Sequence, residues 1–192
     1  MTCTGEPKKG KATDNVARQY LGRLGKIDNG IVAGVSSGLV DGLTFPLMFE
    51  IYQPEERLKL NDSYRSKPQI ASQMIREIKA MGLEIDCVLA DSLSGESTST
   101  FIRCLQGLNL QFAVAIRSNH SVRLPPGQRV RANKWRNFER IFSDGSREVR
   151  YIREIIYGKK RALRYWKITT DIETLPENST WYVMTLASGS LS

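Results

Sequence analysis

Histidine, cysteine and long apolar runs are scarce in this 192-residue sequence. The single histidine, His120, excludes a metal site built on a pair of histidines. Cys3, Cys87 and Cys104 form no close pair, which argues against a disulfide framework and a zinc knuckle and favours free thiols. No apolar run approaches the roughly 18 to 20 residues that span a bilayer, and the start of the sequence holds no apolar signal core. We therefore expect a cytoplasmic protein without a membrane partner.

Acidic residues are scarce in one long stretch, residues 117–167, which we call the basic segment. It contains 15 Lys or Arg against 4 Asp or Glu, whereas the rest of the chain contains 13 against 16. Seven aromatic residues are interleaved with these charges, a mixture that favours a polyanion partner over an ordinary solvated surface. The candidate DNA-binding residues are cations of this segment: Arg129, Arg131, Lys134, Arg136, Arg140, Lys159, Lys160 and Arg161.

Two apolar runs predict an antiparallel hairpin in the first part of the chain. Residues 30–37 and 43–52 flank the turn signal Asp41-Gly42. Pro46 lies inside the second run, which predicts an edge strand or a local irregularity. A helix is expected to begin near Pro68 and to stop at Gly82. Its core-facing stripe has helical spacing: Ile70, Met74, Ile75, Ile78 and Met81.

Asp91 closes a short run of small and apolar residues, 87–90, and a turn rich in Ser and Gly follows it. This pattern predicts a buried strand that carries a carboxylate to the edge of a sheet, where loops meet. A helix over residues 96–108 and a buried strand over residues 111–116 are expected next. A hairpin followed by strand–helix–strand units predicts an α/β (α+β) fold with a mixed sheet and flanking helices.

The basic segment has the pattern of a small antiparallel β subdomain. A turn over residues 143–146 joins two strand-like runs, and residues 148–157 alternate charged and apolar side chains. A second turn at residues 157–160 leads into a run at residues 164–169, and residues 181–185 predict one last strand before a frayed tail. The expected result is a mostly β insertion followed by a return strand.

These elements predict three parts: a core over residues 1–118, a basic β-rich insertion over residues 119–170, and a return strand with its tail over residues 171–192. A carboxylate such as Asp91 could also be the phospho-acceptor of a receiver domain. That class needs an early acidic pair, repeated βα units and a late lysine, whereas here two strands precede the first helix. The sequence also holds no P-loop and no GxGxxG motif.

Several stretches in a fixed order resemble DDE transposases of bacterial insertion sequences, in the branch known as DDE-superfamily endonucleases and common in cyanobacteria. The matching stretches include GEPKKGK, VARQYLGRLGKIDNGIV, LTFPLMF, VLADSLSGES and LPENSTWYVMT. Together they cover nearly all residues up to about Thr185. No single stretch is decisive, but their joint order is specific. The resemblance implies an RNase H-like core with a mostly β insertion late in the core.

The family's chemistry uses three acids that hold two Mg²⁺ or Mn²⁺ ions for DNA strand cleavage and transfer. Asp91 aligns with the second acid, at the end of the fourth core strand, so the resemblance implies a catalytic role as a metal ligand. It also implies DNA, in particular transposon ends, as the partner. The expected location is therefore the cytoplasm, in association with the nucleoid. The chain could also form a homodimer or associate with a full-length transposase, and both possibilities are left open.

The chain departs from the family pattern at the first and third acids. The first acidic positions fall on Thr2 and Cys3, neither of which replaces a hard carboxylate ligand. The helical Tyr-Arg-Glu-Lys signature of the third acid is not found, and Glu154, which matches it in part, is expected to be an exposed strand residue. We therefore expect a central fragment, truncated at both ends. Without the first core strand, the strand at residues 30–37 is expected to have an unpaired edge.

Two hypotheses follow. In the first, the chain comes from a metal-dependent DNA transposase and is itself inactive or incomplete, with Asp91 as a surviving ligand. In the second, the chain is a non-catalytic DNA-binding remnant or a regulator of transposition. Whether this polypeptide is an enzyme stays open at this point. Asp91-dependent nicking of DNA and the salt dependence of DNA binding distinguish the two.

Overall fold

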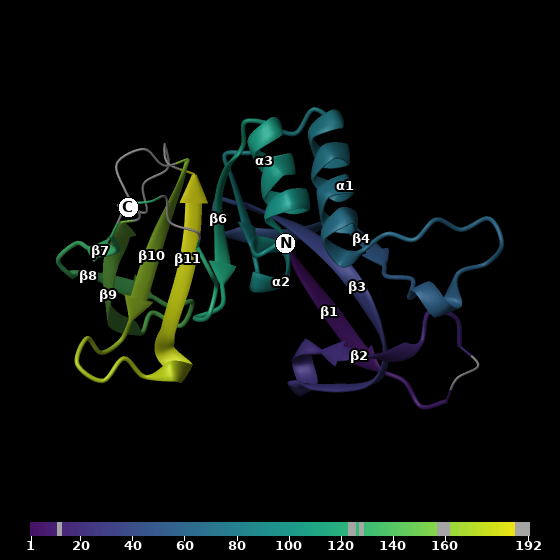
Figure 1. The fold of residues 1–192 in the computed structure, drawn as a ribbon, viewed down its shortest axis with the longest axis horizontal. Coiled ribbons are helices and arrows are strands. Elements are labelled where there is room, and N and C mark those ends of the chain that lie inside the picture. Colours follow the sequence, from purple (N-terminus) through teal and green to yellow (C-terminus); the bar gives the residue numbers. More distant parts are fainter. Residues whose placement is uncertain (11–12, 123–125, 127–128, 157–161, 187–192) are drawn as a thin grey trace. The chain divides into compact units, whose positions relative to one another are not determined.

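The computed structural model describes residues 1–10, 13–122, 126, 129–156 and 162–186 (Figure 1). The chain divides into two compact units. The first unit comprises Met1–Asp86 and Ser97–Asn109, and the second comprises Cys87–Glu96 and Leu110–Ser192. Each unit is described by itself below.

The first unit is built on β3 (Lys26–Val40), a long strand with antiparallel neighbours on both edges. β1 (Thr2–Pro7) pairs with one edge of β3, while β2 (Ala17–Leu21) and β4 (Leu43–Ile51) pair with the other. The connections include the short 3₁₀ turns η1 (Gly22–Leu24) and η2 (Glu55–Arg57). The predicted hairpin is thus confirmed, although its first strand is longer than the sequence indicated.

The hairpin turn and the proline irregularity follow the predicted chemistry. Asp41 and Gly42 both have positive φ angles, 50° and 79°, as a two-residue turn that matches the strand twist requires. Pro46 lies beside a register shift between Ser36 and Ser37, because a proline has no N–H to donate to the ladder. Both predictions are confirmed.

The prediction of an unpaired edge beside residues 30–37 is wrong. β1 pairs with this stretch from Thr2 opposite Val35 to Pro7 opposite Gly30. The expected acidic positions, Thr2 and Cys3, and the residues that follow them therefore form a strand, whose N–H and C=O groups complete the ladder of β3.

The first helix, α1 (Lys67–Ala80), begins and ends close to the predicted bounds. Gln69 Oε1 accepts the Ser66 backbone N–H at 2.8 Å, which satisfies a donor at the helix N-terminus. The predicted stripe is buried at Ile70, Met74, Ile75 and Ile78. Met81 is a correction: it follows the last helical residue and is 66% exposed.

The helix predicted over residues 96–108 is divided into a π-helical turn, η3 (Thr98–Ile102), and a short helix, α3 (Arg103–Gly107). Another short helix, α2 (Ser92–Gly95), precedes them and was not predicted. Phe101 and Leu105 are buried as predicted. α3 lies beside α1 in Figure 1, and the Cys104 thiol donates to the Ser72 carbonyl at 3.7 Å.

The second unit is a seven-stranded mixed sheet (Figure 1). Its path runs through β5 (Cys87–Ala90), β6 (Gln111–Ile116), β11 (Thr180–Leu186), β10 (Leu163–Thr169), β9 (Arg147–Ile156) and β7 (Arg131–Ala132). β8 (Arg136–Ile141) also pairs with β9, and the 3₁₀ turn η4 (Glu177–Ser179) precedes β11. β5 and β6 are parallel and the other pairs are antiparallel, so the strands after β6 extend the sheet that carries Asp91.

The basic segment forms antiparallel strands, as predicted. The turn at residues 143–146 is confirmed, with the Phe142 N–H donating to Ser146 O at 2.9 Å and Gly145 at a φ of 80°. The predicted turn at residues 157–160 and the tail from residue 187 lie outside the described residues. The division into residues 1–118, 119–170 and 171–192 stays a prediction.

The fold is mixed α/β with a mixed sheet and few helices, as expected for an RNase H-like α+β fold. The parallel β5–β6 pair, joined through helical turns, supplies the strand–helix–strand unit of such a fold. None of the described helices is long and apolar enough to cross a membrane.

Candidate functional site

Asp91 lies at the end of strand β5, as the sequence predicts, and the short helix α2 begins directly after it, where a turn was expected. Its carboxylate Oδ1 accepts the Ser94 backbone N–H at 3.3 Å, and its carbonyl accepts the Gly95 N–H at 2.8 Å. The side chain is half-buried. Because the cap bond fixes the carboxylate at a helix N-terminus, Asp91 is held in one orientation at the end of the strand.

The turn after Asp91 is packed tightly against strand β6. A Cβ atom at Gly95 would lie 2.3 Å from the Ala115 carbonyl oxygen and 3.0 Å from Val114 Cβ. Ser94 is also buried. The glycine of the Leu-Ser-Gly-Glu turn is therefore required by close backbone approach, which a side chain would prevent.

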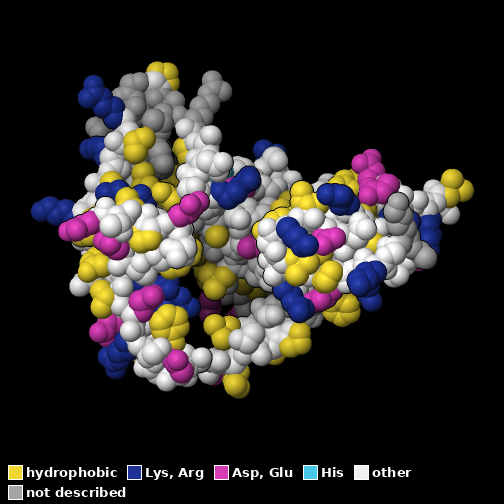
Figure 2. Space-filling view, turned by 90° about the horizontal axis from the view of Figure 1, so that it is seen from below, with side chains coloured by type: hydrophobic (Ala, Val, Ile, Leu, Met, Phe, Trp, Pro, Cys, Tyr) yellow, Lys and Arg dark blue, Asp and Glu magenta, His cyan; other side chains and the backbone are white. Residues whose placement is uncertain are grey.

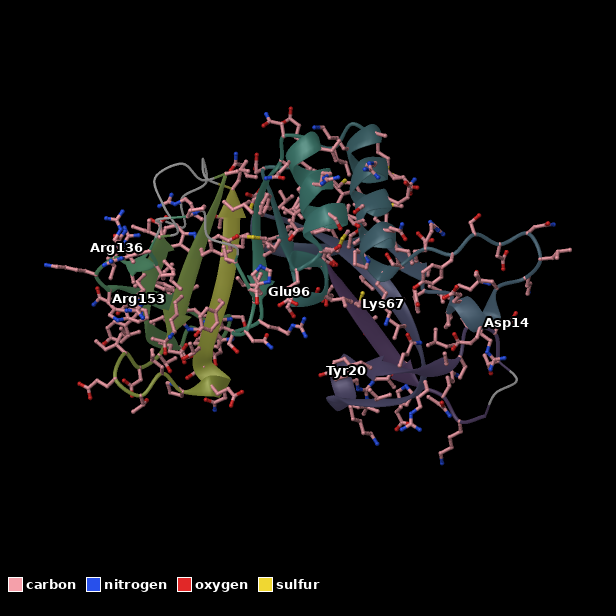
Figure 3. The ribbon with its side chains drawn as sticks, in the orientation of Figure 1. Asp14, Tyr20, Lys67, Glu96, Arg136 and Arg153 are labelled. Atoms are coloured by element: carbon pink, nitrogen blue, oxygen red, sulfur yellow. The ribbon has the colours of Figure 1, made fainter. Side chains whose placement is uncertain are left out.

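Glu96 fastens the same turn to the end of β6 through Arg117. Its carboxylate accepts the Arg117 backbone N–H at 2.7 Å and the Arg117 Nε–H at 2.7 Å. The hydrogen bond from the Arg117 side chain is the main cause that holds the pKa of Glu96 below its usual value. Figure 3 shows Glu96 near strand β6. Glu96 is thus engaged in a structural ion pair beside Asp91's turn.

The positions expected for the first acid lie on β1 in the first unit. Thr2 is exposed and Cys3 is half-buried, and neither provides a carboxylate. Lys67 lies close enough to Cys3 for an electrostatic interaction, and its ammonium sits 4.8 Å from the centre of the Tyr52 ring. Burial lowers the pKa of Lys67, and the interaction with Cys3 opposes this shift.

A carboxylate cluster of the kind that holds two divalent ions is not assembled by the described residues. Nowhere in the described ranges do three or more His, Cys, Asp or Glu side chains gather in a way that could hold a metal ion. Two-metal phosphoryl chemistry needs several carboxylates around the ions. Asp91 could serve as one ligand, but the residues described do not fit a complete centre.

Glu154 is a correction to the sequence prediction. It lies in a strand, β9, as expected, but it is buried with a relative exposure of 5%. Arg164 donates to it twice, from Nε to Oε1 at 3.0 Å and from Nη2 to Oε2 at 3.1 Å. A buried carboxylate is retained here because the planar guanidinium matches both of its oxygens.

The candidate DNA-binding cations that the structure describes are exposed: Arg129, Arg131, Lys134, Arg136 and Arg140. Lys159, Lys160 and Arg161 lie outside the described residues. On β8, Arg136, Phe138 and Arg140 alternate with the other side chains and share one face. Figure 3 places Arg136 and Arg153 at the same end of the sheet.

Positive and negative side chains are mixed on the surface of the chain. On the face in Figure 2, dark blue Lys and Arg side chains are interspersed with magenta Asp and Glu side chains. Exposed cations of the second unit are partly neutralised, since Arg147 pairs with Glu139 at 3.0 Å. Charge counting along the sequence therefore does not identify which cations are available to a polyanion.

Sequence reasoning missed how the tryptophans are used. The three tryptophans of the chain each have an arginine guanidinium over the indole ring, at 4.3–4.5 Å from the ring centre: Arg150 over Trp181, Arg153 over Trp135, and Arg164 over Trp166. Strand register brings each arginine to its tryptophan, and the two residues of a pair are up to 31 positions apart in the sequence. The one available signal was the interleaving of aromatic and basic residues.

Comparison with known proteins identifies the class to which this fold and this Asp91 turn belong. The sequence profile of the DDE superfamily endonuclease family matches residues 3–140. The chain belongs to this family, whose members generally use divalent metal ions.

A particular relative matches most of the chain. Over 181 residues the chain is 58% identical to the "Probable transposase for insertion sequence element IS701" of Microchaete diplosiphon. The match covers 94% of this chain and 48% of the relative. The chain therefore spans about half the length of the curated relative that it matches.

Proposed function

We propose that the chain is a DNA-handling part of an insertion-sequence transposase, an enzyme that cleaves and transfers DNA strands in transposition. The match to DDE superfamily endonucleases over residues 3–140 carries this proposal. The similarity to a protein described as a transposase supports it. The partner would be DNA, in particular transposon ends, and the place of action the cytoplasm at the nucleoid.

DNA binding by this chain is proposed to use the cations selected from the sequence: Arg129, Arg131, Lys134, Arg136, Arg140, Lys159, Lys160 and Arg161. The exposure of the five described residues supports this role, because phosphate contacts require side chains that reach solvent. Arg140 also lies 4.5 Å from the centre of the Phe142 ring, which restricts its guanidinium without neutralising it.

Strand cleavage is proposed to be beyond the chain acting alone. Asp91 is proposed as one surviving metal ligand, but Thr2 and Cys3 provide no carboxylate at the first acidic positions. The lack of a metal-binding cluster among the described residues supports the same view. The chain would then act as a non-catalytic DNA binder, alone, as a homodimer, or with a full-length transposase.

The test is a nicking assay on supercoiled plasmid DNA with Mg²⁺ or Mn²⁺. We expect neither the wild-type chain nor Asp91→Ala to convert the plasmid to the relaxed form. Both proteins should bind the plasmid equally, as judged by a gel-shift control. Nicking by the wild-type chain that disappears in Asp91→Ala would overturn the proposal that the catalytic site is incomplete.

A further inference from the structure

Two of the three tryptophan-stacked arginines have a carboxylate partner, and the third does not. Arg150 pairs with Glu148, and Arg164 pairs with Glu154. Among the described residues Arg153 has no ion-pair partner, and its Nε is buried without a hydrogen-bond partner. A buried guanidinium N–H that lacks an acceptor costs free energy, so a structure that keeps one calls for an explanation.

A second cation lies directly across the sheet from Arg153. Its register partner on β10 is Lys167, so the two Cβ atoms share one face at about 4.5–5.5 Å. The Lys167 ammonium lies 5.3 Å from the centre of the ring of Tyr182, which is its own register partner on β11. Like charges placed directly opposite each other destabilise a sheet. Within the described residues neither cation forms an ion pair with a carboxylate, and each lies over an aromatic ring.

We propose that Arg153 and Lys167 form a clamp for a phosphodiester group of DNA. The clamp rests on the proposed DNA binding and adds a defined site to it, on residues outside the candidate set chosen from the sequence. A guanidinium stacked on Trp135 presents its N–H edge in a fixed plane, which suits two phosphate oxygens. Lys167 adds a point charge. A bound phosphate accepts from the terminal N–H groups of the Arg153 guanidinium and offsets the repulsion between the two cations.

The aromatic rings at both ends of the clamp suit the bases next to the bound phosphate. Trp135 and Tyr182 are both half-buried, so part of each ring reaches solvent. Base stacking on aromatic side chains accompanies backbone contacts in proteins that bind single strands. Because a phosphodiester occurs in single-stranded and duplex DNA alike, the experiment includes both forms.

The decisive comparison uses Arg153→Gln and Lys167→Gln, with Arg150→Gln as the matched control. Arg150 lies on the same strand and is stacked on Trp181, but it is neutralised by Glu148. Fluorescence anisotropy of labelled oligonucleotides is measured across a series of KCl concentrations. We expect each clamp variant to lose about tenfold in affinity, the loss of one charged hydrogen bond. The log–log salt slope should fall by about 0.7 on single strands or about 0.9 on duplex.

The control should change neither quantity by a comparable amount. Equal losses in Arg153→Gln and Arg150→Gln, or no loss in the clamp variants while the wild-type chain binds DNA, would overturn the clamp and leave the proposed function standing. Failure of the wild-type chain to bind any oligonucleotide would instead overturn the proposed DNA binding and, with it, the DNA clamp.

Thermal unfolding gives a readout that does not depend on DNA. Lys167→Gln should leave the Tm unchanged or raise it, because it removes the repulsion from Arg153, and pyrophosphate should raise the Tm of the wild-type chain more than that of Lys167→Gln. A lowered Tm in Lys167→Gln together with no pyrophosphate effect would show that the pair only packs the sheet.

Discussion

Arg164 holds Glu154 through two parallel hydrogen bonds of 3.0 and 3.1 Å within the sheet of the second unit. The two residues lie on neighbouring strands, β9 and β10, and Arg164 also covers the ring of Trp166. The Trp166 Nε1–H in turn donates to Thr185 Oγ1 at 3.1 Å. This network links three strands of the sheet. It stabilises them only while each of its buried polar groups has a hydrogen-bond partner.

Glu154→Ala is expected to lower the free energy of unfolding by about 3 kcal/mol, because it leaves the half-buried Arg164 guanidinium without its carboxylate partner. Chemical denaturation monitored by tryptophan fluorescence measures the change. Glu139→Ala is the control in the same sheet: Glu139 and its partner Arg147 are 54% and 65% exposed, so the expected cost is below about 1 kcal/mol. Equal costs for the two variants would contradict the structural role assigned to Glu154.

Gly95→Ala is expected to destabilise the chain by about 1–3 kcal/mol, because its Cβ would overlap the Ala115 carbonyl and the turn after Asp91 would have to move. Gly107→Ala in α3 is the control, since a Cβ there meets nothing within 4 Å. That variant should be neutral or more stable by up to about 1 kcal/mol, from lower chain entropy in the unfolded state. Denaturant midpoints of the two variants check the contrast.

The ion pair between Glu96 and Arg117 predicts a pH dependence of stability. The folded-state pKa of Glu96 lies below its ordinary value near 4.5, so its stabilisation is complete above that value and is lost as the pH falls through the lower, folded-state pKa. Glu96→Gln should therefore have a lower Tm than the wild-type chain at pH 7, and the difference should shrink below pH 4.5. A Tm difference that stays constant between pH 7 and pH 3 would contradict this role of Glu96.

Local sequence signals predicted many of the elements. The turn at Asp41-Gly42, the strand ending before Asp91 and the strand over residues 111–116 each follow from residue chemistry within a short window. The same reasoning placed the two runs on either side of the turn at residues 143–146 on antiparallel strands, which are β8 and β9. These features depend on hydrophobic period and turn type, which neighbouring residues determine.

Features that depend on pairing between distant segments escaped prediction. The burial of Glu154 requires Arg164 to lie one strand away in the correct register, and the pairing of β1 with β3 covers an edge that looked free. Helical spacing predicts Met81 in the core, but the helix ends one residue earlier. For the candidate site, Asp91 could be placed from the sequence alone, whereas the Arg153–Lys167 pair required the sheet register.

The salt dependence of DNA binding tests the central claim most directly. If each of the five described cations of the candidate set contacts one phosphate, these five alone should contribute about −4.5 to the log–log slope on duplex DNA, and Arg136→Gln combined with Arg140→Gln should reduce the magnitude of the slope by about 1.8. Removing two exposed cations of the first unit, with Lys9→Gln and Arg18→Gln, should leave the slope unchanged. A flat slope for the wild-type chain, or equal changes in both double variants, would contradict the account.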